Sequence, residues 1–267
     1  MIIFKSINKL NKKVNFKANV GFVPTMGSLH KGHISLIKSC KLKCKKTLVS
    51  IFVNPSQFNK TNDFKKYPRD LKKDVAILKK LNVDYLLVPK MNDIYNNKKS
   101  MKININKKDK ILCAKYRPGH FEGVLSVINQ FIKKININKI FLGEKDYQQY
   151  ILIKEFLKKN SKVKTILCRT VRMKNGLAYS SRNRLLNYRS IKVSALFVSK
   201  IKRMFGLLRN NLNNKFILNN FLNKNKKFNI EYMELRNKNN LSKKINKKNV
   251  KIFFAFYVQG VRLIDNF

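Results

Sequence analysis

The chain has 267 residues, 44% of them hydrophobic, which is enough for a buried core in one main domain with a smaller appended domain. Lys and Arg together number 60 against 13 Asp and Glu, which gives a formal net charge of +47. No apolar run approaches the length of a membrane span, and the apolar start at residues 1–4 is too short for a signal-peptide core. These features argue against a membrane-spanning or exported protein, and we expect a cytoplasmic one.

The high positive charge has two interpretations. Taken alone it suggests binding to nucleic acid or to an anionic membrane. However, the Lys residues accompany Asn, Ile and Phe in tracts along the whole chain, such as 11–13, 133–136 and 243–246. A nucleic-acid surface usually gathers its basic residues in one place, so the spread favours compositional drift. We therefore expect no specific nucleic-acid partner and no membrane, although a positive field would still attract a polyanionic substrate.

The four Cys residues are Cys40, Cys44, Cys113 and Cys168. The first two are four residues apart and could form a metal pair, but no second pair completes a tetrahedral site. Reduced thiols are the default state in a cytoplasmic protein.

Short apolar strands alternate with helical patterns over the first two thirds of the chain. The predicted strands are residues 1–5 at a sheet edge, 19–23, 47–53, 85–88, 139–142 and 163–167, and the predicted helices are 34–42, 68–81, 122–135 and 147–157. This alternation predicts βαβ units and a parallel sheet, whose ligands bind beyond the carboxyl ends of the strands.

Beyond residue 168 the pattern changes. A helix is predicted at 193–208 and strands at 252–258 and 261–264, whereas the Asn/Lys-rich stretch 210–248 has only weak patterning. We expect residues 1–168 to form a ligand-binding α/β domain and residues 169–267 a smaller α+β domain.

The first polar cluster is Pro-Thr-Met-Gly-Ser-Leu-His-Lys-Gly-His at 24–33, between a predicted strand and a predicted helix. A helix N-terminus has unpaired N–H groups that bind phosphate, and Gly27 and Gly32 allow the backbone to approach closely. His30 and His33 are three residues apart, so we expect them on one helix face, where they could donate to phosphate oxygens. One such His could be a cap or a core residue, but two His framing a Gly favour a functional site.

Two clusters have side chains suited to a polar or carboxylate substrate. Asn54 and Gln57 follow the strand 47–53, where their amides could orient such a substrate or form an ordinary turn. Arg117, within Tyr-Arg-Pro-Gly-His-Phe-Glu-Gly at 116–123, could clamp a carboxylate or could be incidental in a Pro-Gly turn. Its position before a predicted helix favours a functional role.

Two further clusters could bind phosphate. The first, residues 143–149, follows an apolar strand and places Lys145 between two acidic residues, where it could neutralise phosphate charge or lie in a solvated loop. The second, residues 176–183, has two Ser hydroxyls followed by Arg182, which could form another phosphate grip or cap a helix.

Taken together, these clusters resemble the pantoate–β-alanine ligase (pantothenate synthetase) family. The matching motifs in chain order are P-T-M-G-x-L-H-x-G-H at 24–33, I-F-V-N-P-x-Q-F at 51–58, Y-P-R at 67–69, R-P-G-H-F-x-G-V at 117–124, G-E-K-D-Y-Q-Q at 143–149, G-L-A-x-S-S-R-N at 176–183 and R-L-I-D-N at 262–266. The resemblance implies the Rossmann-like, doubly wound parallel sheet of the H-x-G-H nucleotidyltransferases, with a smaller C-terminal α+β domain closing over the site.

The resemblance also implies a function. Pantoate would be activated by ATP as pantoyl-adenylate, and β-alanine would then take the acyl group to give pantothenate, AMP and pyrophosphate. Mg²⁺ would accompany ATP, and the protein would be a homodimer. Metal ligands do not follow from the sequence, although Asp74 is one candidate.

The family's site residues can be carried over position by position. The ATP site would comprise Met26, Gly27, Ser28, Leu29, His30, Lys31, Gly32, His33, Gly143, Glu144, Lys145, Asp146, Val171, Tyr179, Ser180, Ser181 and Arg182. The catalytic residues would be His33, His30 and Lys145, and the substrate-binding residues Gln57, Gln149, Asn54, Arg117 and His120. Gln57 and Gln149 would hold pantoate, Gln57 would also face β-alanine, and Arg117 and His120 would lie on the β-alanine side.

Three positions depart from the family pattern. Met173 and Asn175 stand where acidic residues are usual, and Tyr179 stands where Met is commoner. They flank the Ser-Ser-Arg sequence and leave it intact, so we expect a slower or less stable enzyme and not an inactive one. Two alternatives are a related H-x-G-H nucleotidyltransferase, which would lack the R-P-G-H and N-P-x-Q-F motifs, and a basic nucleic-acid-binding protein, which would show steeply salt-dependent binding.

Overall fold

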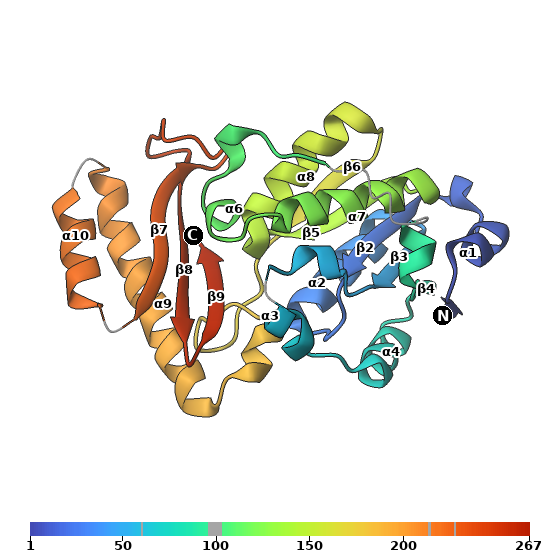
Figure 1. Cartoon of the computed structure of the whole chain (residues 1–267), viewed down its shortest axis with the longest axis horizontal. Helices are drawn as coiled ribbons and strands as arrows, with labels where there is room; N and C mark the ends of the chain where they lie inside the picture. Colours follow the sequence, from blue (N-terminus) through green and yellow to red (C-terminus); the bar gives the residue numbers. More distant parts are fainter. Residues whose placement is uncertain (60, 96–102, 213–214, 227) are drawn as a thin grey trace.

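The first part of the chain folds around a six-stranded sheet in which every strand pair is parallel. The computed structural model describes residues 1–59, 61–95, 103–212, 215–226 and 228–267 (Figure 1). The strands lie in the order β1-β4-β3-β2-β5-β6. Their bounds are β1 Ile2–Phe4, β2 Val20–Thr25, β3 Lys46–Ile51, β4 Tyr85–Leu87, β5 Lys139–Gly143 and β6 Lys164–Cys168. All six strands predicted from the sequence are present, with β1 at an edge.

Helices cover both faces of this sheet because successive strand residues point to opposite sides. On β2, Phe22 packs in a cluster with helices α1, α7 and α8, whereas Val23 packs in a second cluster with α2 and α4. The bounds of these helices are α1 Ile7–Lys13, α2 Lys31–Lys43, α4 Leu71–Lys80, α7 His120–Lys134 and α8 Tyr147–Asn160. Shorter helices are α3 Thr61–Lys66, α5 Met91–Ile94 and α6 Cys113–Tyr116. The predicted doubly wound sheet is therefore confirmed.

The strand order places the two principal loops side by side. β2 is hydrogen-bonded to β3 on one side and to β5 on the other. After β2 the chain adds β3 and β4 on one side and then returns to add β5 and β6 on the other, so the order in which strands are added reverses between β2 and β5. Ligands of open α/β sheets bind at such a switch point, outside the carboxyl ends of the strands. The loop after β2 and the first turn of α2 contain His30 and His33, and the segment after β5 contains Lys145.

A second, antiparallel sheet lies beside the carboxyl ends of the first (Figure 1). It consists of β7 Asn229–Asn237, β8 Val250–Val258 and β9 Val261–Asn266, with helices α9 Tyr188–Asn210 and α10 Lys215–Lys224 on one face. Phe254 and Phe256 pack towards α9, whereas Phe253, which points the other way, contacts Tyr147 at 5.8 Å between ring centroids. One face thus has its own core and the other closes on the parallel-sheet part.

The C-terminal region contains elements that were not predicted. α10 and β7 both lie in the weakly patterned stretch 210–248, of which residues 213–214 and 227 are outside the described residues. Helix α9 also begins five residues before its predicted start at 193, since Asn187 caps it by accepting from the Ser190 N–H at 2.9 Å.

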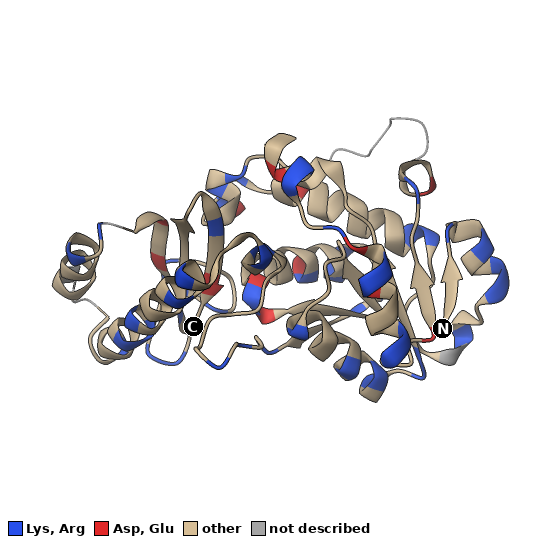
Figure 2. Ribbon diagram, turned by 90° about the horizontal axis from the view of Figure 1, so that it is seen from below, with Lys and Arg blue, Asp and Glu red and all other residues tan. Residues whose placement is uncertain are grey.

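Over the described residues, the basic side chains are spread and do not gather in one patch. Figure 2 shows Lys and Arg on helices, strands and loops of both sheets' regions, which fits compositional drift better than a nucleic-acid surface. All four Cys are free and buried. In the described part of the chain, no helix is long and apolar enough to span a membrane, and no three His, Cys, Asp or Glu residues are grouped as metal ligands.

Candidate active site

A cavity of about 250 Å³ lies at the carboxyl ends of β2, β3 and β5, between them and the antiparallel sheet. Its floor comes from residues that end these strands, such as Thr25, Ser50 and Leu142, and its opposite wall includes Tyr232 and Arg262. Polar and charged side chains from both parts of the chain therefore converge on one cavity. This arrangement is typical of a ligand site.

A buried carboxylate fixes the loop between β2 and α2. The two oxygens of Asp74 accept hydrogen bonds from the N–H groups of Ser28 at 2.8 Å and Leu29 at 2.7 Å. Gly27 has a φ of 79°, and a Cβ there would lie 2.9 Å from an Asp74 oxygen, so this position requires glycine. Because both oxygens are engaged by the backbone, Asp74 serves the loop, and it does not line the cavity as the candidate metal ligand would.

The two imidazoles of this loop lie against each other, with 4.0 Å between ring centroids. His30 caps α2, because its Nδ1 accepts from the Gly32 N–H at 3.1 Å, and its remaining proton is therefore on Nε2. His30 thus precedes the helix and does not lie within it as expected. The Nδ1 of His33 is buried and has no hydrogen-bond partner among the described residues.

Both imidazoles are neutral near pH 7. Burial, then His33 and Lys145, lowers the pKa of His30 to about 2. Burial lowers the pKa of His33 to about 4, against the opposing influence of Asp146. A neutral ring still donates one N–H, so the pair offers hydrogen bonds to an anion without itself carrying charge.

The positive charge at this end of the cavity comes from Lys145. Its Nζ lies 3.2 Å from the Asp146 carboxylate, and both residues line the cavity. The C-terminal sheet fixes the loop: Asn266 donates to the carbonyls of Glu144 and Lys145, each at 3.0 Å, and Lys251 donates to the Glu144 carboxylate at 3.0 Å. Glu144 is therefore occupied in holding the two sheets together.

The 3₁₀ helix Ser181–Leu185 holds the first loop from the other side. The Ser181 hydroxyl donates to the carbonyl of Ser28 at 3.2 Å, and Arg184 donates to the carbonyl of Leu29 at 3.3 Å. The Ser180 hydroxyl caps this helix by accepting from the Arg182 N–H at 3.3 Å. The capping interpretation of Ser180 is correct, yet Ser180, Ser181 and Arg182 also line the cavity.

The carbonyl of Gln57 organises the second group of predicted residues. It accepts from His120 Nδ1 at 2.7 Å and from Arg117 Nη2 at 3.1 Å, so the Nε2 of His120 accepts from Arg117 Nη1 at 2.9 Å. Burial and the adjacent Arg117 hold the pKa of His120 well below its usual range. By contrast, Asn54 is fully buried, and its amide donates to the carbonyl of Gly123 and accepts from Ser56.

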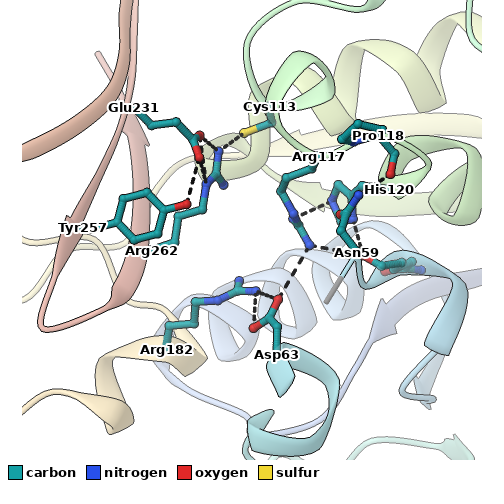
Figure 3. Close-up of polar contacts among 11 residues, drawn as sticks. Asn59, Asp63, Cys113, Arg117, Pro118, His120, Arg182, Glu231, Tyr257 and Arg262 are labelled. Atoms are coloured by element: carbon teal, nitrogen blue, oxygen red, sulfur yellow. Dashed lines mark hydrogen bonds and ion pairs between the residues drawn. The ribbon is translucent and has the colours of Figure 1, made fainter. Parts of the chain in front are cut away.

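Two carboxylates that the sequence did not single out hold the arginines of the site (Figure 3). Asp63 on α3 pairs with Arg182 at 2.9 and 3.2 Å and lies 4.0 Å from Arg117. Glu231 on β7 pairs with Arg262 on β9, at 3.0 Å from Nε. The only signal for either carboxylate is the scarcity of acidic residues, 13 in the whole chain.

The cavity unites most of the residues predicted from the sequence. Those that line it are Met26, His30, Gly32, His33, Gln57, Arg117, His120, Gly143, Lys145, Asp146, Gln149, Val171, Tyr179, Ser180, Ser181 and Arg182. All of the predicted residues lie within the described chain. Those that do not line the cavity are Gly27, Ser28, Leu29, Lys31, Asn54 and Glu144. Further lining residues that were not predicted as ligands include Tyr67, Cys113, Arg169, Thr170, Tyr232 and Arg262.

The turn that departs from the family pattern is intact. The side-chain oxygen of Asn175 accepts from the Leu177 N–H at 3.2 Å, and Gly176 has a φ of 87°. Met173 and Leu177 are joined by a backbone hydrogen bond of 2.8 Å. Asn supplies the acceptor that such a turn needs, so the substitution at 175 leaves the segment leading to Tyr179 in place.

Comparison with known proteins agrees with this geometry. The model of the Pantoate-beta-alanine ligase family matches residues 2–267. A pantothenate synthetase from Francisella philomiragia is 41% identical over 276 residues, covering 100% of this chain and 97% of the relative. One from Francisella tularensis subsp. novicida is 40% identical over 278 residues, with the same coverage of 100% and 97%.

Solved structures show the same fold. A pantothenate synthetase from Thermus thermophilus has a TM-score of 0.88 at 27% identity and covers 100% of this chain and 99% of its own. A pantoate-β-alanine ligase from Francisella tularensis, complexed with β-γ ATP and β-alanine, has a TM-score of 0.83 at 38% identity, with coverage of 100% and 97%.

Proposed function

The chain belongs to the pantoate-β-alanine ligase family, and we propose that it condenses pantoate with β-alanine in an ATP-dependent reaction through pantoyl-adenylate. One observation carries the proposal: one cavity at the sheet's switch point has two imidazoles and a lysine at one end and amide and guanidinium groups at the other. The Francisella tularensis relative was solved in complex with β-γ ATP and β-alanine, in agreement with such a two-part site.

The first step joins pantoate to the adenylyl group. A carboxylate oxygen of pantoate attacks the α-phosphorus of ATP, and the bond to pyrophosphate breaks. His33 and His30 donate ring N–H groups and Lys145 supplies a full positive charge, so negative charge developing on the leaving pyrophosphate is stabilised. The N-terminus of α2, where His33 and the cavity-lining Gly32 lie, adds the positive end of the helix dipole.

The second step transfers the acyl group. The amine of β-alanine attacks the acyl carbon of the mixed anhydride, and AMP leaves with the bonding electrons of the C–O bond. Gln57 and Gln149 hold pantoate, and Arg117 and His120 define the β-alanine side. The protein acts mainly by placing the reactants together and by keeping water from the anhydride.

Mg²⁺ fits the donor set as an ion brought with ATP. The Asp146 carboxylate lines the cavity beside Lys145, and Mg²⁺ in nucleotide sites commonly uses one or two carboxylates together with phosphate oxygens and water. When bound, it would neutralise triphosphate charge. Asp146 would hold it.

Three further proposals follow from the family. Residues 1–168 form the nucleotide-binding domain and residues 169–267 the domain that closes over it. The enzyme acts in the cytoplasm, and it assembles as a homodimer, which sedimentation would reveal as twice the mass of 31.4 kDa.

The decisive experiment is pantoate-dependent exchange of labelled pyrophosphate into ATP, with Mg²⁺ and without β-alanine. We expect exchange that requires pantoate, because adenylate formation is reversible and needs no amine. Folded protein that binds ATP but shows no such exchange would contradict the proposal and indicate another acid substrate.

A further inference from the structure

Three arginines from three different elements meet at one wall of the cavity (Figure 3). Arg117 follows α6, Arg182 lies on the 3₁₀ helix Ser181–Leu185, and Arg262 lies on β9. We call these three residues the arginine wall. Their side chains are 14%, 25% and 14% exposed, so the charges are largely removed from bulk water. Buried charges of one sign are costly unless they are paired.

The wall is only partly neutralised. Asp63 pairs with Arg182 and Glu231 with Arg262, which leaves two carboxylates for three guanidinium groups. Burial, then the charges of Arg182 and Arg262, lowers the pKa of Arg117 to about 10, as expected for crowded like charges. One positive charge therefore remains for a ligand, and a monoanion matches it, whereas a triphosphate carries more charge than the wall can balance.

Arg262 retains free donors towards that ligand. Its Nε and Nη2 donate to Glu231, and Nη2 also lies 3.5 Å from the Cys113 sulfur. Among the described residues, Nη1 has no hydrogen-bond partner, although Arg262 lines the cavity. Cys113 and Arg117 are four residues apart at α6, joined by a backbone hydrogen bond of 2.9 Å, so the contact to Cys113 brings Arg262 to the side of Arg117.

We propose that Arg262, held in place by Glu231, forms with Arg117 the seat of the carboxylate of β-alanine and so selects an amine that carries an acid group. This inference rests on the proposed function. Pantoate also has a carboxylate, but that group loses its charge when it joins the adenylyl group. The carboxylate of β-alanine stays ionised through both steps, and a permanent positive charge is suited to it.

The test separates the two half-reactions in the variant Arg262→Gln. Pantoate-dependent pyrophosphate exchange should stay within about threefold of the parent enzyme, which also shows that the variant is folded. With saturating ATP and pantoate, the KM for β-alanine should rise roughly 10- to 100-fold, the loss expected for one charge-assisted hydrogen bond. The preference for β-alanine over β-alaninamide, which lacks the acid group, should shrink by a similar factor. Arg262→Lys should lose less than Arg262→Gln, both in the KM for β-alanine and in the preference for β-alanine over β-alaninamide.

The matched control is Arg236→Gln. Arg236 is also buried on the antiparallel sheet and paired with a glutamate, Glu234, but it does not line the cavity. This variant should keep the parent KM and the parent preference for β-alanine. An Arg262→Gln enzyme that retains both would overturn the inference, and so would one whose exchange reaction falls as steeply as its use of β-alanine. Absence of exchange in the parent enzyme would instead contradict the proposed function itself.

Discussion

The two ends of the cavity differ in how they manage charge. At the imidazole end, formed by His30, His33 and Lys145, two of three groups are neutral, and the buried Nδ1 of His33 lacks a partner among the described residues. At the arginine wall every group is charged, and two carboxylates serve all three, since Asp63 pairs with Arg182 and lies 4.0 Å from Arg117 while Glu231 pairs with Arg262. The two imidazoles that stabilise transient charge form no ion pair with any described residue, whereas the arginines that recognise permanent charge are held in place by carboxylates before the ligand arrives.

The largest expected effect is on adenylate formation, when a residue of the imidazole end is removed. His33→Ala should lower pantoate-dependent pyrophosphate exchange by roughly 10²–10³-fold, because a donor to the leaving pyrophosphate is lost. The KM for β-alanine, measured on preformed pantoyl-adenylate, should change little, since the arginine wall is untouched. A loss of exchange smaller than about threefold would remove His33 from the mechanism.

A second experiment tests what holds the imidazole end in place. Asp74→Ala should reduce the free energy of unfolding by about 2–4 kcal/mol, because the N–H groups of Ser28 and Leu29 lose a charged acceptor inside the protein. Urea unfolding measures this. The control is Asp70→Ala, which removes only the exposed cap of α4 and should cost about 1 kcal/mol. Equal losses in the two variants would refute a special role for Asp74.

The lowered pKa of His33 makes the stability of the protein depend on pH. The pKa of His33 is lowered from 6.5 to about 4, so between these values the unfolded chain binds a proton that the folded chain does not. Stability therefore falls as pH drops through this window, by up to about 1.4 kcal/mol per pH unit from this group. Above pH 6.5 His33 contributes no pH dependence.

Urea midpoints at pH 7.5, 6.5, 5.5 and 4.5 would measure this decline. His33→Asn should make it shallower by the share that His33 contributes, because the variant has no ring to protonate at that position, while His30 and His120, whose pKa values are also lowered, still contribute to the decline. Carboxylates titrate in both proteins, so the difference between the two curves isolates the imidazole. Parallel curves would show that His33 is protonated as readily in the folded chain as in the unfolded one.

The two ends of the cavity also differ in how far the sequence predicts them. The imidazole end and the Lys145 loop were predictable because each follows an apolar strand directly, and parallel strands bring their carboxyl ends to one edge. The carboxylate partners of the arginine wall could not be predicted, since Asp63 and Arg182 are 119 residues apart and no local pattern links them. Similarly, β7 was missed because it lies within an Asn/Lys-rich stretch and its own alternation is broken at a bulge between Ile230 and Tyr232, whereas pairing with β8 along its length determines it.

The smallest expected effect concerns Tyr179, which borders the imidazole end where the family more often has Met. Its ring centroid lies 6.3 Å from that of His30 and 5.7 Å from the Lys31 ammonium, contacts that contribute about 0.5–1 kcal/mol at a partly exposed site. Tyr179→Met should therefore change the KM for ATP by less than about threefold and leave the KM for β-alanine unchanged. Tyr188→Met, at a side chain 82% exposed, serves as the control for a general effect of the replacement. A tenfold change in the KM for ATP would mean that the ring, and not only the loop that carries it, forms part of the imidazole end.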